Sequence, residues 1–239
     1  MKCNFLTDWL GEIFPDQVLE RAGEGRTVLG ASLRKLTAPG CMLGPTQVDH
    51  ITTQAPYLVE FCVHGNSGLA EPALITVGTK LLQLQTFRSP SSHFTPRAMS
   101  VIASLQYLHT LDVSYSACPE ESFRTLATSP LRNRLTTLRA SHVFRLSNEC
   151  IVALLDNNGC NKLTFLDLSG NSELDNRAIE AIGRNLRELK YLNIEEVGRF
   201  DNTGTIHGVV LYPYIPRHDN VGWMSRSSNT NCWPKSKYR

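Results

Sequence analysis

A short apolar pattern recurs seven times along the 239 residues of the chain. Each copy reads L-x-x-[LF]-x-[apolar or small], and successive copies begin about 24 to 28 residues apart. Because successive side chains of a β-strand point to opposite faces, each copy predicts a short strand with one buried face. The copies are LRKLTA from Leu33, LVEFCV from Leu58, LQTFRS from Leu84, LHTLDV from Leu108, LTTLRA from Leu135, LTFLDL from Leu163 and LKYLNI from Leu189.

The second half of six units contains an apolar anchor, followed by apolar residues five and eight positions later. The later two residues are one i, i+3 step apart, so they predict a helix with one buried face. Thr95, Ser147 and Asp175 directly follow their anchors, where a side-chain oxygen can cap the helix N-terminus. The anchors are Leu43, Leu69, Phe94, Cys118, Leu146 and Leu174; the +5 residues are Val48, Leu74, Met99, Phe123, Ile151 and Ile179; the +8 residues are Ile51, Val77, Ile102, Leu126, Leu154 and Ile182.

Each unit is therefore predicted to be a strand, a turn and a helix of about ten residues, with a period typical of leucine-rich repeats. One unit cannot bury its apolar side alone, whereas stacked units share a continuous core. The expected fold class is an α/β leucine-rich-repeat solenoid, a right-handed βα superhelix with a concave parallel sheet and convex helices. We expect an N-terminal helical cap over residues 1–32, about seven repeats over 33–204 and a basic tail over 205–239.

These repeats resemble the cysteine-containing leucine-rich repeats of F-box/LRR proteins and the related ribonuclease-inhibitor-like superfamily. The segment CNKLTFLDLSGNSELDNRAIEAI, residues 160–182, is similar almost throughout to C-x-x-L-x-x-L-x-L-x-x-[CN]-x-x-[IL]-T-D-x-x-L-x-x-L. The resemblance covers residues 33 to about 200 and implies binding of a protein partner, as in the substrate-recognition arm of F-box/LRR ubiquitin-ligase receptors in SCF-dependent protein catabolism. The chain has no recognisable F-box. At the [CN] position stand Cys41, Asn66 and Asn171, with Ser92 and Ser116 as close substitutes and Val143 and Val197 as departures.

Strand alternation directs the third, fifth and seventh residues of each copy to the concave face. At the fifth position, four consecutive copies carry charges of alternating sign, on strands about 4.8 Å apart. One interpretation is a self-neutralising surface network that contributes little stability per pair. The other is a polar strip that contacts a partner, with aromatic anchors beside it. The predicted partner-binding residues are Glu60, His64, Arg88, Asp112, Arg139, Phe165, Asp167, Tyr191 and Asn193.

Catalytic signatures are sparse in the sequence. Cys62 and His64 lie two residues apart near Glu60, a spacing that could suggest a thiolate nucleophile, but no third orienting group or oxyanion element accompanies them. The chain has no G-x-S-x-G elbow, P-loop, G-x-G-x-x-G turn or H-E-x-x-H helix. We therefore expect no enzyme, cofactor or metal site, and we expect the dispersed cysteines to be reduced. Inert packing is expected for Cys41, Cys118, Cys150 and Cys160.

Composition narrows the class of protein. Apolar residues make up 41%, charged residues 19%, and the net charge is +2, which excludes a long disordered chain or a nucleic-acid-coating protein. No stretch approaches the roughly 20 apolar residues of a membrane span, and the N-terminus lacks a signal-peptide layout. We expect a monomer in the cytoplasm or nucleus.

The positive charge is concentrated in residues 205–239, which carry five Lys/Arg against one Asp, so the preceding 204 residues have a net charge of −2. This tail could contact nucleic acid or an acidic partner, be a poorly ordered end of a truncated or spliced chain, or cap the seventh strand irregularly. Two other functions remain open: a ribonuclease-inhibitor-like or GTPase-activator-like regulatory scaffold, and a truncated repeat fragment without its own partner.

Overall fold

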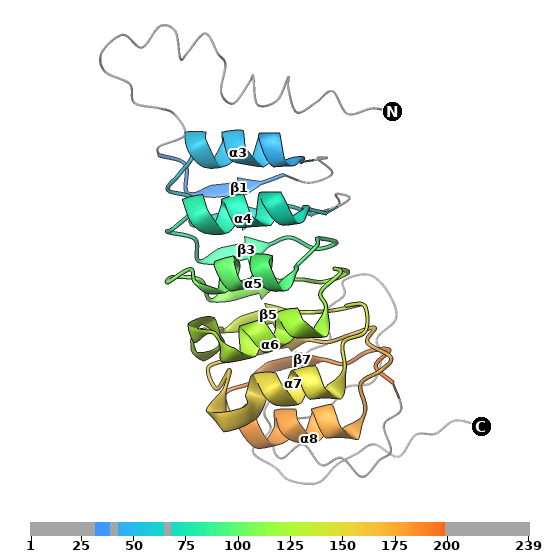
Figure 1. Ribbon diagram of the computed structural model, residues 1–239. Coiled ribbons are helices and arrows are strands. Elements are labelled where there is room, and N and C mark those ends of the chain that lie inside the picture. The colour runs from blue at the N-terminus through green and yellow to red at the C-terminus, as the bar shows by residue number, and fades with distance from the viewer. Residues whose placement is uncertain (1–31, 39–42, 65–67, 199–239) are drawn as a thin grey trace, which may run out of the picture.

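Strands and helices alternate along the chain in the computed structural model of the protein, which describes residues 32–38, 43–64 and 68–198 (Figure 1). The strands are β1 (Lys35–Thr37), β2 (Glu60–Cys62), β3 (Thr86–Arg88), β4 (Thr110–Asp112), β5 (Thr137–Arg139), β6 (Phe165–Asp167) and β7 (Tyr191–Asn193). The α-helices are α3 (Pro45–Gln54), α4 (Glu71–Lys80), α5 (Pro96–Ala103), α6 (Glu120–Thr128), α7 (Asn148–Leu155) and α8 (Asn176–Asn185). Every strand falls in one of the seven predicted copies.

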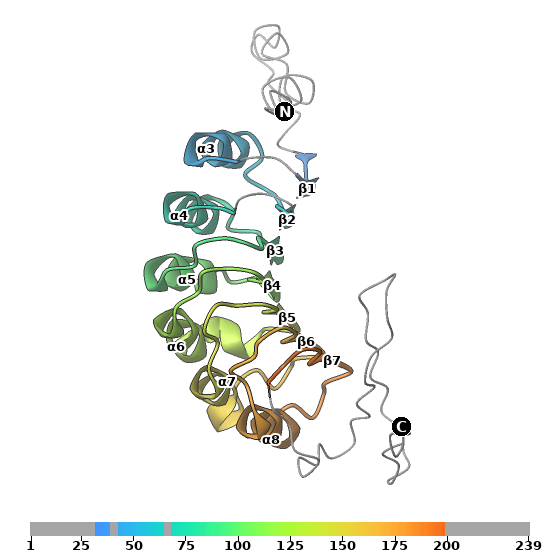
Figure 2. The same ribbon diagram turned by 90° about the vertical axis from the view of Figure 1, so that its right-hand side faces the viewer.

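The seven strands form one sheet in the order in which they occur along the chain, and each pairs in parallel with the next. Figure 2 shows the strands on the inner side of an arc and the helices on its outer side. Each helix packs against the helix of the neighbouring unit. The predicted concave sheet and convex helix layer are therefore confirmed.

The space between the two layers is filled by the apolar positions of the repeat. Every anchor, +5 residue and +8 residue is buried, with at most 5% of its surface exposed. In the first half of the stack, the core is aromatic: the rings of Phe61 and Phe87 stack with centroids 6.1 Å apart, and Phe94 meets Phe87 edge-on at 6.4 Å. Full burial of such side chains contributes about 1.5 to 3 kcal/mol each, so the repeated pattern supplies most of the driving force.

The three predicted helix caps are present. Thr95 Oγ1 accepts a hydrogen bond from the Ala98 amide at 3.2 Å, and Ser147 Oγ accepts one from the Cys150 amide at 3.4 Å. Asp175 Oδ1 accepts one from the Arg177 amide at 2.9 Å. These side chains satisfy backbone donors that a helix leaves free in its first turn.

Side chains at the [CN] position join neighbouring units. Ser116 Oγ accepts from the Ser92 amide at 2.9 Å, and Ser92 Oγ accepts from the Leu69 amide at 2.8 Å. Where Val143 departs from the pattern, the next unit compensates, because Asn171 Oδ1 accepts from the Val143 amide at 2.9 Å. Buried polar side chains at this position thus satisfy backbone groups that the short strands leave unpaired.

Two short 3₁₀ segments, Pro130–Asn133 and Asp156–Asn158, account for the two longest units, which begin at Leu108 and Leu135.

Several predictions fall outside the described residues: the cap over residues 1–31, Cys41, Asn66, the helix start at 200–204 and the tail over 205–239.

Candidate functional site

The strand register brings the predicted concave-face residues into rows. Arg88 pairs with Asp112, Asp112 with Arg139, and Arg139 with Asp167, so four charges of alternating sign lie on adjacent strands. We call Arg88, Asp112, Arg139 and Asp167 the charged row. Asn193 continues it on β7. The parallel row two residues earlier on each strand contains Glu60, Thr86, Thr110, Thr137, Phe165 and Tyr191.

The carboxylates of the charged row bind the backbone, and they form no ion pair with its guanidinium groups. Asp112 Oδ1 accepts from the Ser114 amide at 3.0 Å, and Asp167 Oδ1 accepts from the Ser169 amide at 3.1 Å. Within the described ranges, no salt bridge joins any two members of the row. The alternation of charge is as predicted, but no salt bridge of a self-neutralising network is formed within the row, and one oxygen of each aspartate binds the turn after its strand instead.

Arg88 and Arg139 are half-buried, and the Nε atom of each is buried without a hydrogen-bond partner in the part of the chain that the structure describes. An orphaned buried donor costs about 1 to 3 kcal/mol, more when it is charged. Arg139 is held in place by stacking, since its guanidinium carbon lies 4.6 Å from the centroid of the Phe165 ring. A stacked guanidinium keeps its in-plane N–H donors free for a planar acceptor such as a carboxylate.

Phe165 in turn lies on Tyr191, with ring centroids 4.1 Å apart and planes 6° apart. Phe165 is partly exposed, whereas Tyr191 is only 5% exposed. The two predicted aromatic anchors therefore differ: Phe165 offers a ring to the concave surface, and Tyr191 supports it from the neighbouring strand. Arg139, Phe165 and Tyr191 form one continuous stack across β5, β6 and β7.

The other predicted site residues lie at the β2 end of the surface. Glu60 forms a salt bridge with Lys35 at 3.1 Å across β1 and β2, and its other carboxylate oxygen accepts from Cys62 Sγ at 3.8 Å. His64 is exposed just after β2. Glu60 thus has an ion-pair partner, whereas Arg88 and Arg139 have none within the described ranges.

The cysteine chemistry does not favour a nucleophile. Burial raises the pKa of the Cys62 thiol, Arg88 opposes that rise, and Glu60 adds to it, so the thiolate is disfavoured. Cys118, Cys150 and Cys160 are buried free thiols, as predicted, and burial raises the pKa of Cys160 to about 12. Over residues 32–38, 43–64 and 68–198, no group of three or more His, Cys, Asp or Glu side chains could hold a metal ion.

Comparison with known proteins informs the fold. No family model and no curated protein matches the chain. Among solved structures 109 chains match, including an internalin (inlF) from Listeria monocytogenes str. 4b F2365, with a TM-score of 0.51 and 16% sequence identity. The match covers 81% of this chain and 53% of the internalin chain, so it spans about half the length of that protein. The fold is a leucine-rich-repeat solenoid. At this identity the likeness extends to fold alone, and the finer resemblance to F-box/LRR repeats remains a prediction.

An exposed rim borders the concave face of the solenoid at the carboxyl ends of β4 and β5, and sequence reasoning missed it. It consists of Tyr115, His142 and Phe144, with Tyr115 and Phe144 59% and 68% exposed. Tyr115 and His142 stack with centroids 4.6 Å apart, and both have left-handed backbone conformations, with φ of 57° and 50°. The equivalent place in the next unit is Gly170, also left-handed, with φ of 71°. Bulky residues at a position suited to glycine were the signal in the sequence.

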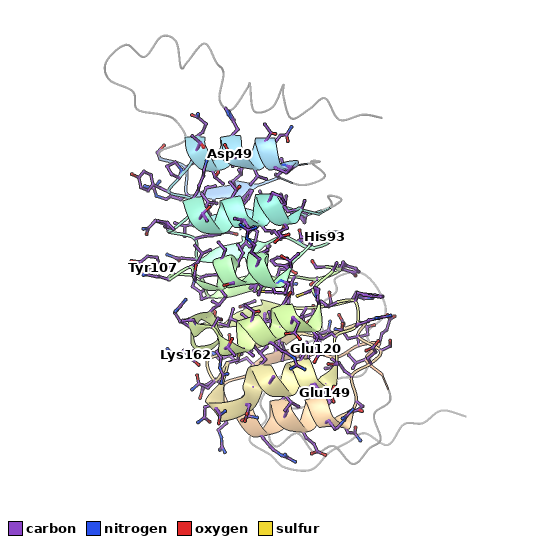
Figure 3. All side chains as sticks on the ribbon, in the orientation of Figure 1. Asp49, His93, Tyr107, Glu120, Glu149 and Lys162 are labelled. Atoms are coloured by element: carbon purple, nitrogen blue, oxygen red, sulfur yellow. The ribbon has the colours of Figure 1, made fainter. Side chains whose placement is uncertain are left out.

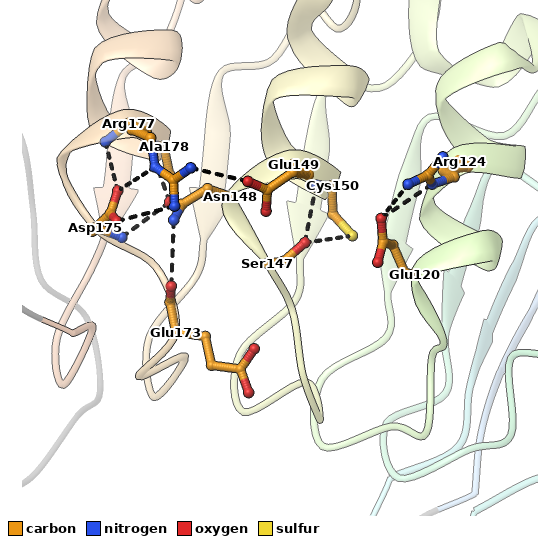
Figure 4. Close-up of polar contacts among 10 residues, drawn as sticks. All are labelled: Glu120, Arg124, Ser147, Asn148, Glu149, Cys150, Glu173, Asp175, Arg177 and Ala178. Atoms are coloured by element: carbon orange, nitrogen blue, oxygen red, sulfur yellow. Dashed lines mark hydrogen bonds and ion pairs between the residues drawn. The ribbon is translucent and has the colours of Figure 1, made fainter.

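The convex face presents charges that are paired with one another. Arg177 contacts Glu149 at 3.0 Å between α8 and α7, and Arg124 contacts Glu120 at 2.5 Å within α6 (Figure 4). Glu120 and Glu149 lie on the helix layer in Figure 3. Such exposed pairs contribute little stability, but they leave few ionic groups free for a ligand. Further pairs are Lys80 with Asp49 and Arg184 with Glu180.

A second exposed edge lies at the amino ends of the strands. Tyr57, Leu82 and Tyr107 are each at least half exposed, and the Arg34 guanidinium lies 5.5 Å from the Tyr57 ring. Figure 3 places Tyr107 and Lys162 along this edge and His93 along the opposite one.

None of the described helices is long and apolar enough to cross a membrane.

Proposed function

We propose that this solenoid is a protein-interaction module that binds a partner on its concave strand face. The observation that carries the proposal is that Arg88 and Arg139, half-buried on the concave face, form no salt bridge with any residue that the structure describes. The charges of the helix layer, by contrast, are largely matched with each other. A partner that supplies carboxylates to the concave face would pair with the outer nitrogens of guanidinium groups that have no ion pair among the described residues.

The residues around Arg139 have the chemistry of an interface centre. Interface hot spots are enriched in Trp, Tyr and Arg, and they work best when the side chain is already ordered before binding. Arg139 is ordered by Phe165, and Phe165 is ordered by Tyr191. A partner therefore meets a rigid stack and loses little side-chain entropy there.

The proposal is tested by isolating binding partners with the wild-type chain and with Arg139→Ala/Phe165→Leu. Partners that require the wild-type stack, and are retained by the convex-face variant Glu149→Ala/Arg177→Ala, support a concave site. Equal recovery with all three proteins overturns it. Thermal melts of each variant establish that it is folded.

A complementary test uses Asp112→Ala/Arg139→Ala. Since no salt bridge joins these two residues, the double variant should retain most of the stability and lose partner binding. A lower melting temperature with unchanged binding would assign the row a structural role instead.

The finer proposal is that the module is the substrate-recognition arm of an SCF-type ubiquitin ligase in the cytoplasm or nucleus, acting as a monomer. It is supported by the resemblance of residues 160–182 to the F-box/LRR repeat. Co-purification of cullin-ligase subunits with the wild-type chain tests this role. Their reproducible absence alongside an enzyme whose activity changes on binding would favour the regulatory-scaffold alternative.

A further inference from the structure

We infer that the concave partner is an α-helix that lies across β3 to β6 and carries charges of alternating sign one helical turn apart. Acidic side chains of the helix would face Arg88 and Arg139, and basic ones would face Asp112 and Asp167. This inference rests on the proposed function, because it specifies what occupies the same face.

The charged row retains binding capacity at each of its members. Among the described residues, the Nε atoms of Arg88 and Arg139 have no hydrogen-bond partner and neither arginine forms a salt bridge. Asp112 and Asp167 accept their hydrogen bonds through Oδ1. Among the described residues, Oδ2 of each has no donor, so a partner can bind it. The four groups therefore present donor, acceptor, donor and acceptor in succession.

The spacing of the row selects the helix over an extended strand. Adjacent strands are about 4.8 Å apart, so three steps from Arg88 to Asp167 span about 14 Å. Three turns of an α-helix advance about 16 Å. Three same-face steps of an extended chain advance about 20 Å. When each chain is centred on the row, the terminal positions of the helix lie about 1 Å out of register and those of an extended chain about 3 Å, so the helix matches the row more closely.

The row two residues earlier on each strand would form the surface beneath the bound helix, and this surface ends at β6. Thr86, Thr110 and Thr137 are small side chains aligned side by side on β3, β4 and β5. Phe165 ends this surface on β6, where its stack with Tyr191 stands beside the row. An apolar side chain at the end of the bound helix would therefore contact the exposed part of the Phe165 ring.

The test is a selection from displayed alanine-based helices of about five turns. Four positions on one face, one turn apart, are each Glu, Lys or Gln, and the full chain is the immobilised target. Helices with strictly alternating signs should be enriched at least about tenfold over helices with four like charges, since alternation in either chain direction meets the row. No enrichment of any helix, or equal enrichment of alternating and uniform patterns, overturns the inference.

Reversal of the row provides the matched control. Arg88→Glu/Arg139→Glu makes all four members acidic, so the selected pattern should change to uniform Lys. Arg177→Glu on the convex face should leave the alternating preference unchanged. If the double variant does not unfold cooperatively, Arg139→Glu alone gives three consecutive acidic members, so strictly alternating helices should lose their advantage over helices with three consecutive Lys. An alternating preference unaffected by Arg139→Glu also overturns the inference. Loss of natural partners in Arg139→Ala/Phe165→Leu with no alternating preference would refute the helix while preserving the proposed function.

Discussion

The side-chain amide of Asn171 donates a hydrogen bond to the carbonyl oxygen of Ala140, one unit earlier, at 2.8 Å. The same amide donates to Leu168 at 2.6 Å, and Oδ1 accepts from Val143. Asn171 is only 3% exposed, so none of these groups can turn to water instead. One side chain therefore completes the backbone hydrogen bonding of two neighbouring turns.

Replacement of Asn171 by alanine should destabilise the solenoid by at least about 2 kcal/mol, because several buried backbone groups would lose their partner. Denaturant unfolding of Asn171→Ala measures the loss. Asn161→Ala, at an exposed position two residues before the unit of Asn171, is the matched control and should change the free energy of unfolding by less than about 0.5 kcal/mol. Similar values for the two variants would contradict the assigned role.

Asp175 caps α8, and the Arg177 amide lowers the pKa of its carboxyl group below the ordinary 3.8. A lowered pKa in the folded chain gives stability that is present above pH of about 3.8 and lost as the pH falls. Asp175→Ala should cost about 1 kcal/mol at neutral pH, and less at lower pH. Asp175→Asn should keep the neutral-pH stability and weaken the acid dependence; a pH-independent cost of Asp175→Ala argues against the charge effect.

Gly170 lies against the His142 ring of the exposed rim. A Cβ atom at this position would overlap the His142 ring, and φ is +71°. Gly170→Ala should therefore destabilise the chain by about 1 to 2 kcal/mol from the left-handed backbone, plus a steric part. In a His142→Ala background only the backbone part should remain. Strict additivity of the two substitutions in thermal unfolding would show that the overlap costs nothing.

The buried thiol of Cys160 should make the folded chain less stable at high pH. Burial raises its pKa from 9.0 to about 12, with Arg132 opposing the shift, so the folded chain holds this proton more tightly than the unfolded chain. The resulting stabilisation is complete below pH of about 9 and disappears between about 9 and 12. Urea unfolding under reducing conditions should show the difference between wild type and Cys160→Ala shrinking by up to about 1.4 kcal/mol per pH unit in that interval. A constant difference would contradict the burial effect.

The backbone plan could be predicted from sequence because the same spacing is repeated in every unit. Leu36, Phe87 and Leu166 lie in equivalent strand positions, and each is buried, since a one-residue shift would have exposed a whole row. The caps at Thr95 and Asp175 were likewise predictable, because capping depends on residues adjacent in sequence. The resemblance to F-box/LRR repeats covers the same elements and awaits a functional test.

The pairing within the candidate site could not be predicted from spacing alone. Register placed Arg139 beside Asp112 and Asp167, but each aspartate binds an amide two residues further along its own chain. That local hydrogen bond competes with an ion pair and depends on the turn after the strand. The exposed stacking of Tyr115 on His142 could not be predicted either, because a hydrophobic pattern identifies buried positions and says little about aromatic residues in turns.

The strands have the same order in the sheet as in the sequence. This order determines which parts of the solenoid lose stability when one unit is altered. Since each unit packs mainly on the units before and after it, cooperativity is transmitted through nearest-neighbour interfaces. A lesion at Asn171 or Gly170 should weaken β5 to β7 first and leave the Phe61–Phe87–Phe94 core less affected. Hydrogen exchange would then rise in a gradient along the arc, so the chain can lose order at one end while remaining folded at the other.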